Sequence, residues 1–387
     1  MKRCLTLLLA AVMVLGAMSV VYAEHEPVLC AGGSFMITCD NQGNWKVWGD
    51  HQFGQLGRGN KTTKKVVYDF MSKNEDIDPA HIRNAFAGCD YSYLLMDDGR
   101  IFGCGNGSNG CFLKGGIHLT HIEIPIEDKT IVTMAPGFGQ TLALNEAGEV
   151  YAWGRNNAGQ VGIGKKISPV REIMKLDLPK ITAIAAGGKF SIALDEEGCI
   201  WGWGDNANHE LANTKDKAFY SPIKIDTGDL RFTMIDAGGS FIAAVDTNGD
   251  LYTWGANDHC QCSFETKKNA DVTVPTKVDL PLPVKHISVY SGQGYAVLTD
   301  GSLWSWGNNA YGQLGLGYRS AASVGVPLNK IYDSGVERVV VGSLFMQAML
   351  EDGTLISTGM NKFGQLARTA PYWGDSTLQP NGIDLIQ

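Results

Sequence analysis

A Trp-Gly pair that returns about every fifty residues constrains this chain more than any other feature. The pair stands at Trp48-Gly49, Trp153-Gly154, Trp203-Gly204, Trp254-Gly255 and Trp306-Gly307, and the altered copies Cys104-Gly105 and Thr358-Gly359 complete the series. The intervals between these glycines are 56, 49, 50, 51, 52 and 52 residues, so the chain carries seven copies of one unit. A period of this length is typical of repeat proteins, whose units bury their apolar faces against one another.

Each copy also repeats the signals of a β-hairpin. A second glycine lies six residues before the glycine of the pair, usually after an acidic residue or Asn, as in Asp98-Gly99 and Asp352-Gly353. Glycine supplies the positive φ that tight hairpin turns need. Apolar and small residues alternate around these turns, which is the pattern of a strand. In the fourth copy the pattern predicts strands at 181–186, 190–195, 199–203 and 222–225.

Seven units of four short strands predict an all-β fold, a seven-bladed β-propeller with four-stranded antiparallel blades over residues 24–387. In this fold Trp fills the gap between blades and the following Gly permits a bend. The last candidate strand, 382–386, completes the seventh copy, so no strand clearly crosses from the end of the chain to the first blade.

The segments 150–164 (VYAWGRNNAGQVGIG) and 303–317 (LWSWGNNAYGQLGLG) resemble the regulator of chromosome condensation repeat. The resemblance covers about residues 28–387 and implies a seven-bladed propeller. Members of that family exchange nucleotide on the GTPase Ran and bind chromatin, act as protein scaffolds, or, in a secreted bacterial relative, inhibit β-lactamases through aromatic-rich loops. Fold alone chooses none of these.

Two departures argue against an exchange factor. The family often has His eight residues before the turn glycine, where this chain has Phe35, Tyr91, Gln140, Phe190, Phe241 and Phe345, with Gln293 in the shortened sixth copy. There is also no obvious extra hairpin of the kind used against Ran.

The start of the chain is typical of a signal peptide. Lys2 and Arg3 precede an apolar run, and Val21-Tyr22-Ala23 fits a cleavage site, so residues 1–23 are predicted to be removed. The mature protein is then expected outside the cytoplasm, without a membrane span. The full chain has a formal charge of −8, and such an acidic body argues against nucleic acid as the main partner.

Eight cysteines remain after the signal peptide, and disulfides and free thiols both stay open. His259-Cys260-Gln261-Cys262 could seed a zinc site, but no further ligands stand nearby, so a disulfide or free thiols are favoured. The run Gly159–Lys166 imitates a phosphate loop but lacks its Ser or Thr, and Gly105–Gly110 imitates a dinucleotide fingerprint without a following helix. Both are predicted to be pieces of the repeat, and we expect no cofactor and no catalytic residue.

Charges follow the phase of the repeat. Acids gather in the turn between the second and third strands, and cations in the loop after the Trp-Gly strand, so the two faces of the disc are predicted to be acidic and basic. His51 and His209 stand in equivalent loops and are expected to be solvated. The candidate partner-binding residues share these loops: Lys61, Lys65, Lys114, Lys166, Lys217, Lys268, Arg319, Phe53, Tyr311, Phe363 and Trp373.

Cations beside aromatic side chains are typical of protein interfaces. The sequence therefore predicts a secreted, monomeric, non-enzymatic scaffold that binds a protein, possibly an acidic one, through one face. Two alternatives stay open: an enzyme inhibitor resembling the β-lactamase-inhibitory propeller, and a glycan-binding protein or enzyme with a site in the central channel.

Overall fold

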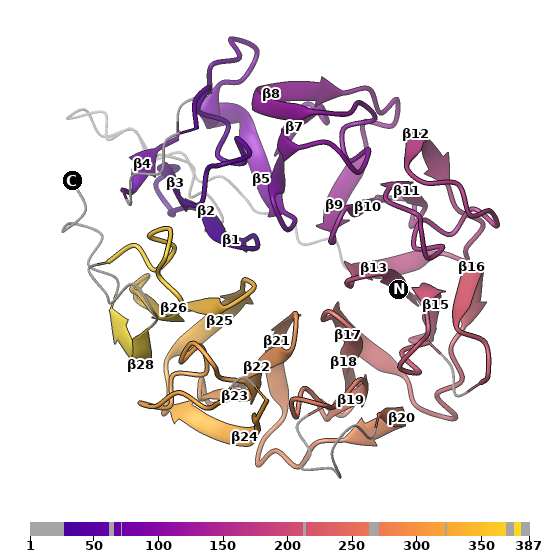
Figure 1. The fold of residues 1–387 in the computed structure, drawn as a ribbon, viewed down its shortest axis with the longest axis vertical. Helices are drawn as coiled ribbons and strands as arrows, with labels where there is room; N and C mark the ends of the chain where they lie inside the picture. Colours follow the sequence, from indigo (N-terminus) through magenta and orange to yellow (C-terminus); the bar gives the residue numbers. More distant parts are fainter. Residues whose placement is uncertain are drawn as a thin grey trace, which may run out of the picture.

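The computed structural model describes residues 27–61, 66–70, 72–211, 214–262, 271–321, 323–368 and 375–380. Seven four-stranded antiparallel sheets stand in a ring around a central channel (Figure 1). The only helical element in these ranges is the short 3-10 turn η1 (Pro79–His81). The prediction of an all-β, seven-bladed propeller is confirmed.

Strands follow one another outward from the channel in every blade. The innermost strands are β1 (Val28–Ala31), β5 (Ile82–Ala87), β9 (Ile131–Pro136), β13 (Ile181–Ala186), β17 (Phe232–Ala237), β21 (Val284–Tyr290) and β25 (Val336–Val341). The second strands are β2 (Phe35–Cys39), β6 (Tyr91–Met96), β10 (Gln140–Asn145), β14 (Phe190–Asp195), β18 (Phe241–Asp246), β22 (Gln293–Leu298) and β26 (Phe345–Leu350).

The third strands end in or just after the Trp-Gly pair: β3 (Trp45–Gly49), β7 (Ile101–Asn106), β11 (Val150–Gly154), β15 (Ile200–Asp205), β19 (Leu251–Gly255), β23 (Leu303–Asn308) and β27 (Leu355–Gly359). The outer strands are β4 (Tyr68–Asp69), β8 (Ile117–Ile124), β12 (Val170–Lys175), β16 (Ala218–Lys224), β20 (Val272–Lys277), β24 (Gly325–Tyr332) and β28 (Asp375–Pro380). In the fourth blade the first two strands match the prediction. β16 begins four residues early because Gly204 pairs with Phe219, past a bulge in the register.

The tryptophans of the repeat are buried between blades, as predicted. The indole Nε1 of Trp203 donates to the carbonyl oxygen of Gln160 in the preceding blade at 2.9 Å. Trp254 and Trp306 donate in the same way to the carbonyl oxygens of Glu210 and Gln261, both at 2.8 Å. The glycine after each Trp leaves room for the neighbouring hairpin. A Cβ on Gly204, whose φ is +104°, would lie 2.5 Å from the carbonyl oxygen of Lys189.

The ring closes without an exchanged strand. β1–β4 form the first blade and β25–β28 the last, and the two lie side by side in Figure 1. Trp48 donates to the carbonyl of Gln365 at 3.0 Å, and the Ser343 N–H donates to the carbonyl of Gly33 at 2.9 Å. The outer strand of the last blade is β28, not residues 382–386 as predicted; those residues, like the predicted signal peptide 1–23, lie outside the described ranges.

The antiparallel order assigns each connection to one face of the disc. First-to-second turns and third-to-fourth loops share one face, here called the loop face. Second-to-third hairpins and the connections between blades share the other, the hairpin face. At the loop-face end of the channel the rings of Phe138 and Tyr290, from blades on opposite sides of the ring, meet with their centroids 5.0 Å apart.

Candidate protein-docking face

The long loops of the loop face are held by buried asparagines. In the third blade, Asn156 lies two residues after the Trp-Gly glycine. Its side-chain oxygen accepts the N–H of Val161 at 2.9 Å, and its amide donates to the carbonyls of Lys165 and Ile167 at 2.8 and 3.1 Å. Asn309 holds the sixth blade's loop in the same way. Because the anchor satisfies the loop's own backbone groups, the exposed part of each loop starts from a fixed base.

A buried glutamine holds the tip of the turn in five of the seven blades. The side-chain oxygen of Gln55, Gln313 and Gln365 accepts the N–H of the residue two positions earlier, at 2.8 to 2.9 Å. Those earlier residues are the predicted aromatics Phe53, Tyr311 and Phe363. Each aromatic therefore has its backbone pinned while its side chain is half-buried at the surface.

The ring order sorts the predicted residues into two arcs. Phe53, Tyr311 and Phe363 belong to the first, sixth and seventh blades, which are consecutive around the ring. The exposed lysines Lys114, Lys166 and Lys217 belong to the second, third and fourth blades; Lys61 (first blade) and Arg319 (sixth blade) are also exposed. Lys65, Lys268 and Trp373 lie outside the described residues. We call the first set the aromatic arc and the three lysines the basic arc.

Exposed apolar side chains add to this face. Ile167 is 58% exposed beside Lys166, and Tyr318 and Val324 are 52% and 53% exposed in the loop of the sixth blade. Large apolar side chains that stay in water are a marker of surfaces that bind other molecules. Ile167 and Val324 were not among the predicted residues, because a loop position gives no periodic signal of exposure.

Ion pairing differs between the faces. The ion pairs among the described residues lie on the hairpin face, as in Lys180–Glu196 at 3.0 Å and Lys277–Asp250 at 2.5 Å, with the single exception of Asp258–His259. The acidic turns are thus partly neutralised, whereas the lysines of the basic arc form no ion pair with a described residue. Carboxylates are also present on the loop face, near the channel, where burial raises the pKa of Asp50 and of Asp90.

A polar hollow of about 580 Å³ lies on the loop face over the fifth and sixth blades. Asp258, His259 and Asp271 line it, with Asn208 from the fourth blade. Sequence reasoning missed this hollow. The sequence did offer one sign that this loop is unusual. Five copies have Gly just before the buried Gln or Cys of the turn, but the fifth copy has Cys260 there. Cys260 has a φ of +54°, a backbone conformation that is unfavourable for any residue other than Gly.

The cysteines of the described residues are free thiols. Cys262 is fully buried and its thiol donates to the carbonyl of Ala256 at 3.3 Å, so it does not pair with its neighbour Cys260. Among the described residues no metal-ligating cluster forms around His259. His51 is not solvated as predicted. It is 1% exposed, it takes the place of the anchoring Asn in the first blade, and burial lowers its pKa to about 4.

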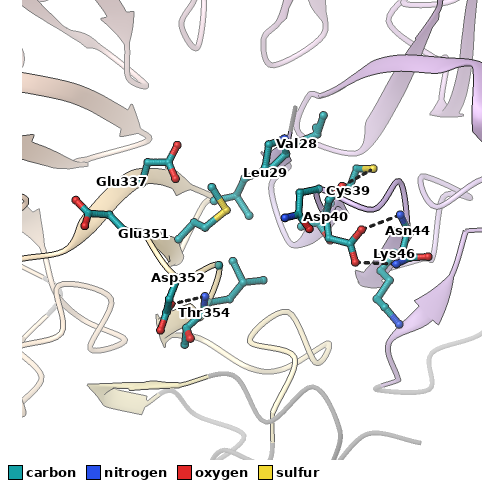
Figure 2. A pocket seen from close by; sticks show the side chains of 16 residues that line it. Val28, Leu29, Cys39, Asp40, Asn44, Lys46, Glu337, Glu351, Asp352 and Thr354 are labelled. Carbon is teal, nitrogen blue, oxygen red and sulfur yellow. Dashed lines mark hydrogen bonds between the residues drawn. The ribbon is translucent and has the colours of Figure 1, made fainter. Parts of the chain in front are cut away.

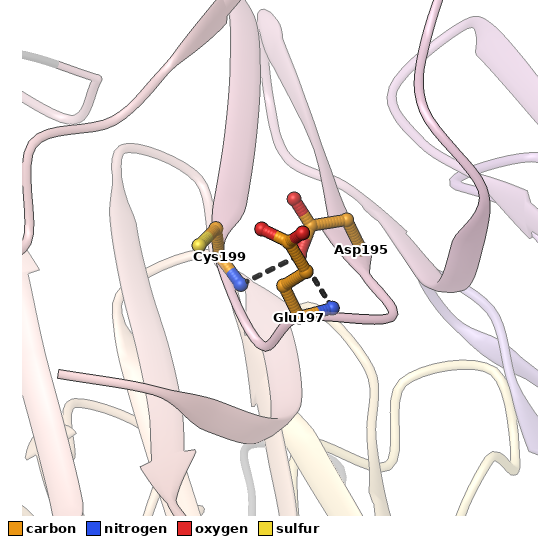
Figure 3. A group of neighbouring side chains, drawn as sticks. All are labelled: Asp195, Glu197 and Cys199. Carbon is orange, nitrogen blue, oxygen red and sulfur yellow. Dashed lines mark hydrogen bonds between the residues drawn. The ribbon is translucent and has the colours of Figure 1, made fainter.

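Asp195, Glu197 and Cys199 bring three possible ligand atoms within 4.8 Å of one another (Figure 3). The Asp195 carboxylate is already engaged. One oxygen accepts the N–H groups of Glu197 and Cys199 at 3.0 and 2.8 Å, and the other accepts the indole N–H of Trp201 at 2.9 Å. The arrangement is an Asx turn that closes the hairpin, and it recurs in other blades, as at Asp246.

Among the described residues, a half-buried carboxyl group stands in the channel wall. Asp236 lines a cavity of about 550 Å³ formed by the innermost strands. Its oxygens accept the N–H groups of Val289 and Ala237 at 2.7 and 2.8 Å, and burial raises its pKa to about 7. Since the Val289 contact joins β17 to β21, the carboxyl ties two blades together.

These features define a class: a repeat propeller in which buried side chains, mostly Asn and Gln, anchor the loops of one face. The comparison with known families agrees, because the model of the RCC1-like domain matches residues 18–328 and 116–386. The chain belongs to the RCC1-like domain family.

Curated relatives share less than a third of their residues with this chain. It is 28% identical over 313 residues to mouse E3 ubiquitin-protein ligase HERC2, covering 77% of this chain but 6% of that protein. It is 29% identical to RUG3, a mitochondrial RCC1 domain-containing protein of Arabidopsis thaliana, covering 71% and 63%, and 27% identical to the ultraviolet-B receptor UVR8 of the same plant, covering 78% and 70%.

Solved structures agree on the fold. Prp20p from Saccharomyces cerevisiae, described with its binding to Gsp1p and histones, superposes with a TM-score of 0.76 at 21% identity over 92% of this chain and 87% of Prp20p. Human WBSCR16 gives 0.71 at 19% identity, over 82% and 85%. No helix in the described residues is long and apolar enough to span a membrane.

Proposed function

We propose that this chain is a non-enzymatic protein-binding scaffold that acts outside the cytoplasm and binds its partner with the loop face. The observation that carries the proposal is the construction of that face. Buried Asn and Gln side chains fix the base of the loops, and the exposed positions carry cations and aromatics. Preorganised loops bind with a smaller loss of conformational entropy than flexible ones.

The two arcs indicate the chemistry of the partner. Half-buried aromatic side chains are suited to be anchors that pack into a partner. Lysines without ion pairs to described residues attract carboxylates and speed association. A partner that offers an apolar patch on one side and an acidic patch on the other would fit the aromatic and basic arcs together.

Relatives support the coarser part of this proposal. Prp20p is described with binding to Gsp1p and histones, and yeast RCC1 with Kap60 bound, so proteins of this fold bind other proteins. HERC2 is a ubiquitin ligase, but this chain spans only 6% of it. The location outside the cytoplasm is supported by the apolar leader of residues 1–23 and is tested by sequencing the N-terminus of exported protein, which should begin at Glu24.

The experiment compares charge reversals on the two faces. The mature chain is used to capture a partner from the native extracellular fluid, and its affinity for the wild-type protein is measured. Lys166→Glu with Lys217→Glu reverses two exposed cations of the basic arc, and Lys224→Glu with Lys285→Glu reverses two exposed cations of the hairpin face. We expect the first pair to weaken binding on the order of tenfold or more, mostly through the association rate.

The second pair should leave the affinity unchanged. Equal losses from the two pairs would refute the assignment of the binding face. An inhibitory role is separated by adding the chain to the captured partner, if that partner is a hydrolase. Stoichiometric loss of its activity would show inhibition, and unchanged activity would leave simple binding.

A further inference from the structure

The last of the seven seams lacks, among the described residues, a backbone contact that the hairpins of the third to sixth blades make with the next blade. In the fourth, fifth and sixth blades the glycine of the second-to-third hairpin, namely Gly198, Gly249 and Gly301, accepts the N–H of the first residue of the next innermost strand at 2.9 to 3.0 Å. A Cβ on Gly301 would lie 2.5 Å from the nitrogen of Gly335. The incoming chain thus packs directly on the hairpin.

At the last seam this covering is absent within the described residues. No backbone N–H of that part of the chain reaches the carbonyl of Gly353, and a Cβ on Gly353 would meet nothing within 4 Å. The seams that follow the third, fourth and fifth blades also receive a buried apolar residue from the connection that leaves the outer strand, namely Leu176, Ile225 and Val278.

A groove of about 610 Å³ opens at this seam, on the hairpin face (Figure 2). We call it the seam groove, and its lining residues include Val28, Leu29, Met349, Leu355, Asp40, Lys46, Glu337, Glu351 and Asp352. Val28 and Leu29 lie between the two blades in Figure 2, with Glu337, Glu351 and Asp352 on one side and Asp40 with Lys46 on the other. The size is within the range of known ligand sites.

The groove is negatively charged. Asp40 and Asp352 accept hydrogen bonds from turn N–H groups, which lower the pKa of both carboxyls and keep them ionised. Glu351 forms no ion pair with a described residue. Lys46, the one lysine among the described residues that line the groove, pairs with Asp69 at 3.2 Å.

We infer that the seam groove binds an extended segment of a partner protein in which aliphatic and cationic side chains alternate. Such a segment would cross the seam as the connections do at other seams. Its N–H would donate to the Gly353 carbonyl, its aliphatic side chains would cover Val28 and Leu29, and its cations would meet the carboxylates of Glu351 and Asp352. Recognition of an extended chain by backbone hydrogen bonds and alternate side chains is an established mode of peptide binding.

The sequence segments outside the described residues on either side of this seam carry the same sign of charge as the groove. Residues 381–387 (NGIDLIQ) and 24–26 (EHE) are the sequence counterparts of a connection at this seam, and they bring the acids Asp384, Glu24 and Glu26. Like charges placed together disfavour such an occupant. The charge of the walls therefore favours a cationic segment from another molecule.

The test uses two labelled heptapeptides, one alternating Val with Lys and one alternating Val with Glu, and the complete mature chain. Fluorescence polarisation should show saturable, salt-sensitive binding of the Lys peptide and none of the Glu peptide. Glu351→Gln should weaken that binding by about two- to fivefold, the range expected for one exposed charge pair. Glu146→Gln is the matched control, because Glu146 is the equivalent exposed acid of the third blade, whose seam is covered.

Three results would overturn the inference: equal binding of the two peptides, equal effects of the two substitutions, or binding of the Lys peptide only to a variant that ends at Pro380. The last result would identify residues 381–387 as the occupant. Because the groove lies on the hairpin face, none of these results bears on the role proposed for the loop face.

Discussion

Glu210 offers a sharp test of how the repeat is built, because it stands where five other blades have a buried Gln. It is 1% exposed, and its carboxylate accepts the backbone and side-chain N–H groups of Asn208 at 3.0 Å. No cation of the described residues forms an ion pair with it. Burial raises its pKa from 4.5 to about 7.

The upward shift of the Glu210 pKa determines how stability changes with pH. A carboxyl whose pKa is raised in the folded state binds its proton more tightly there than in the unfolded chain. Its contribution to stability is therefore fully present below the pKa of the unfolded chain and is lost as the pH rises through about 7. The shift is about 2.5 units, and each unit is 1.36 kcal/mol. Ionised Glu210 should therefore cost about 3 kcal/mol at pH 8 and little at pH 4.5.

Glu210→Gln should raise the free energy of unfolding by about 2–3 kcal/mol at pH 8 and leave it nearly unchanged at pH 4.5. Gln160→Glu is the matched reverse change in the third blade. It should lower stability at pH 8, more so because the Gln160 amide donates to Asn157 at 3.1 Å. Urea unfolding at pH 4.5 and pH 8 measures the change in the free energy of unfolding for each of the two variants. A gain for Glu210→Gln that does not change with pH would refute the reasoning.

Three further outcomes are expected. Gly301→Ala and Gly353→Ala place a Cβ at similar positive φ values, +75° and +83°, but only the first meets backbone atoms; urea unfolding should show the larger loss for Gly301→Ala, and equal losses would contradict the open seam. Trp48→Phe should lower the free energy of unfolding by about 1–3 kcal/mol, since it leaves the Gln365 carbonyl without its donor, and no loss would mean that this bond does not hold the ring closed. His121, whose pKa burial lowers to about 3, is protonated more easily when unfolded, so stability should fall as pH drops from 6.5 to 4.5; His121→Asn should flatten that slope, and an unchanged slope would assign it to other groups.

The fold could be predicted from the sequence because its constraints are local and repeated seven times. Trp203 and Gly204 indicate a tightly packed position that recurs at the same place in the other copies, and Asp195-x-x-Gly198 indicates a hairpin turn. The ends of strands were harder to predict. The start of β16 depends on a bulge opposite Gly202–Gly204, and no residue of the outer strand indicates that bulge in the sequence. The last blade was misjudged because residues 382–386 look as strand-like as β28.

The candidate site could be predicted only in part. Loop positions followed from the phase of the repeat, so Lys166 and Phe363 were located correctly on one face. Burial within those loops did not follow. His51 was expected in water, but it anchors the first blade's loop as Asn156 anchors the third. The hollow at Asp258 and Asp271 depends on how neighbouring loops meet, which is tertiary information.

The repeat that stabilises the ring also allows the exposed residues of the loop face and of the seam groove to vary in sequence. On the loop face the buried anchors, such as Asn156 and Gln160, bond to backbone groups, so the exposed residues between them can change without loss of the loop's base. On the hairpin face the connection to the next blade packs on the hairpin glycine of the third to sixth blades, whereas no described residue does so at Gly353. Gly353 lines the seam groove, and no described backbone N–H donates to its carbonyl. Closure of the ring thus joins the first and last blades at a seam whose packing differs from that of the seams after the third to sixth blades.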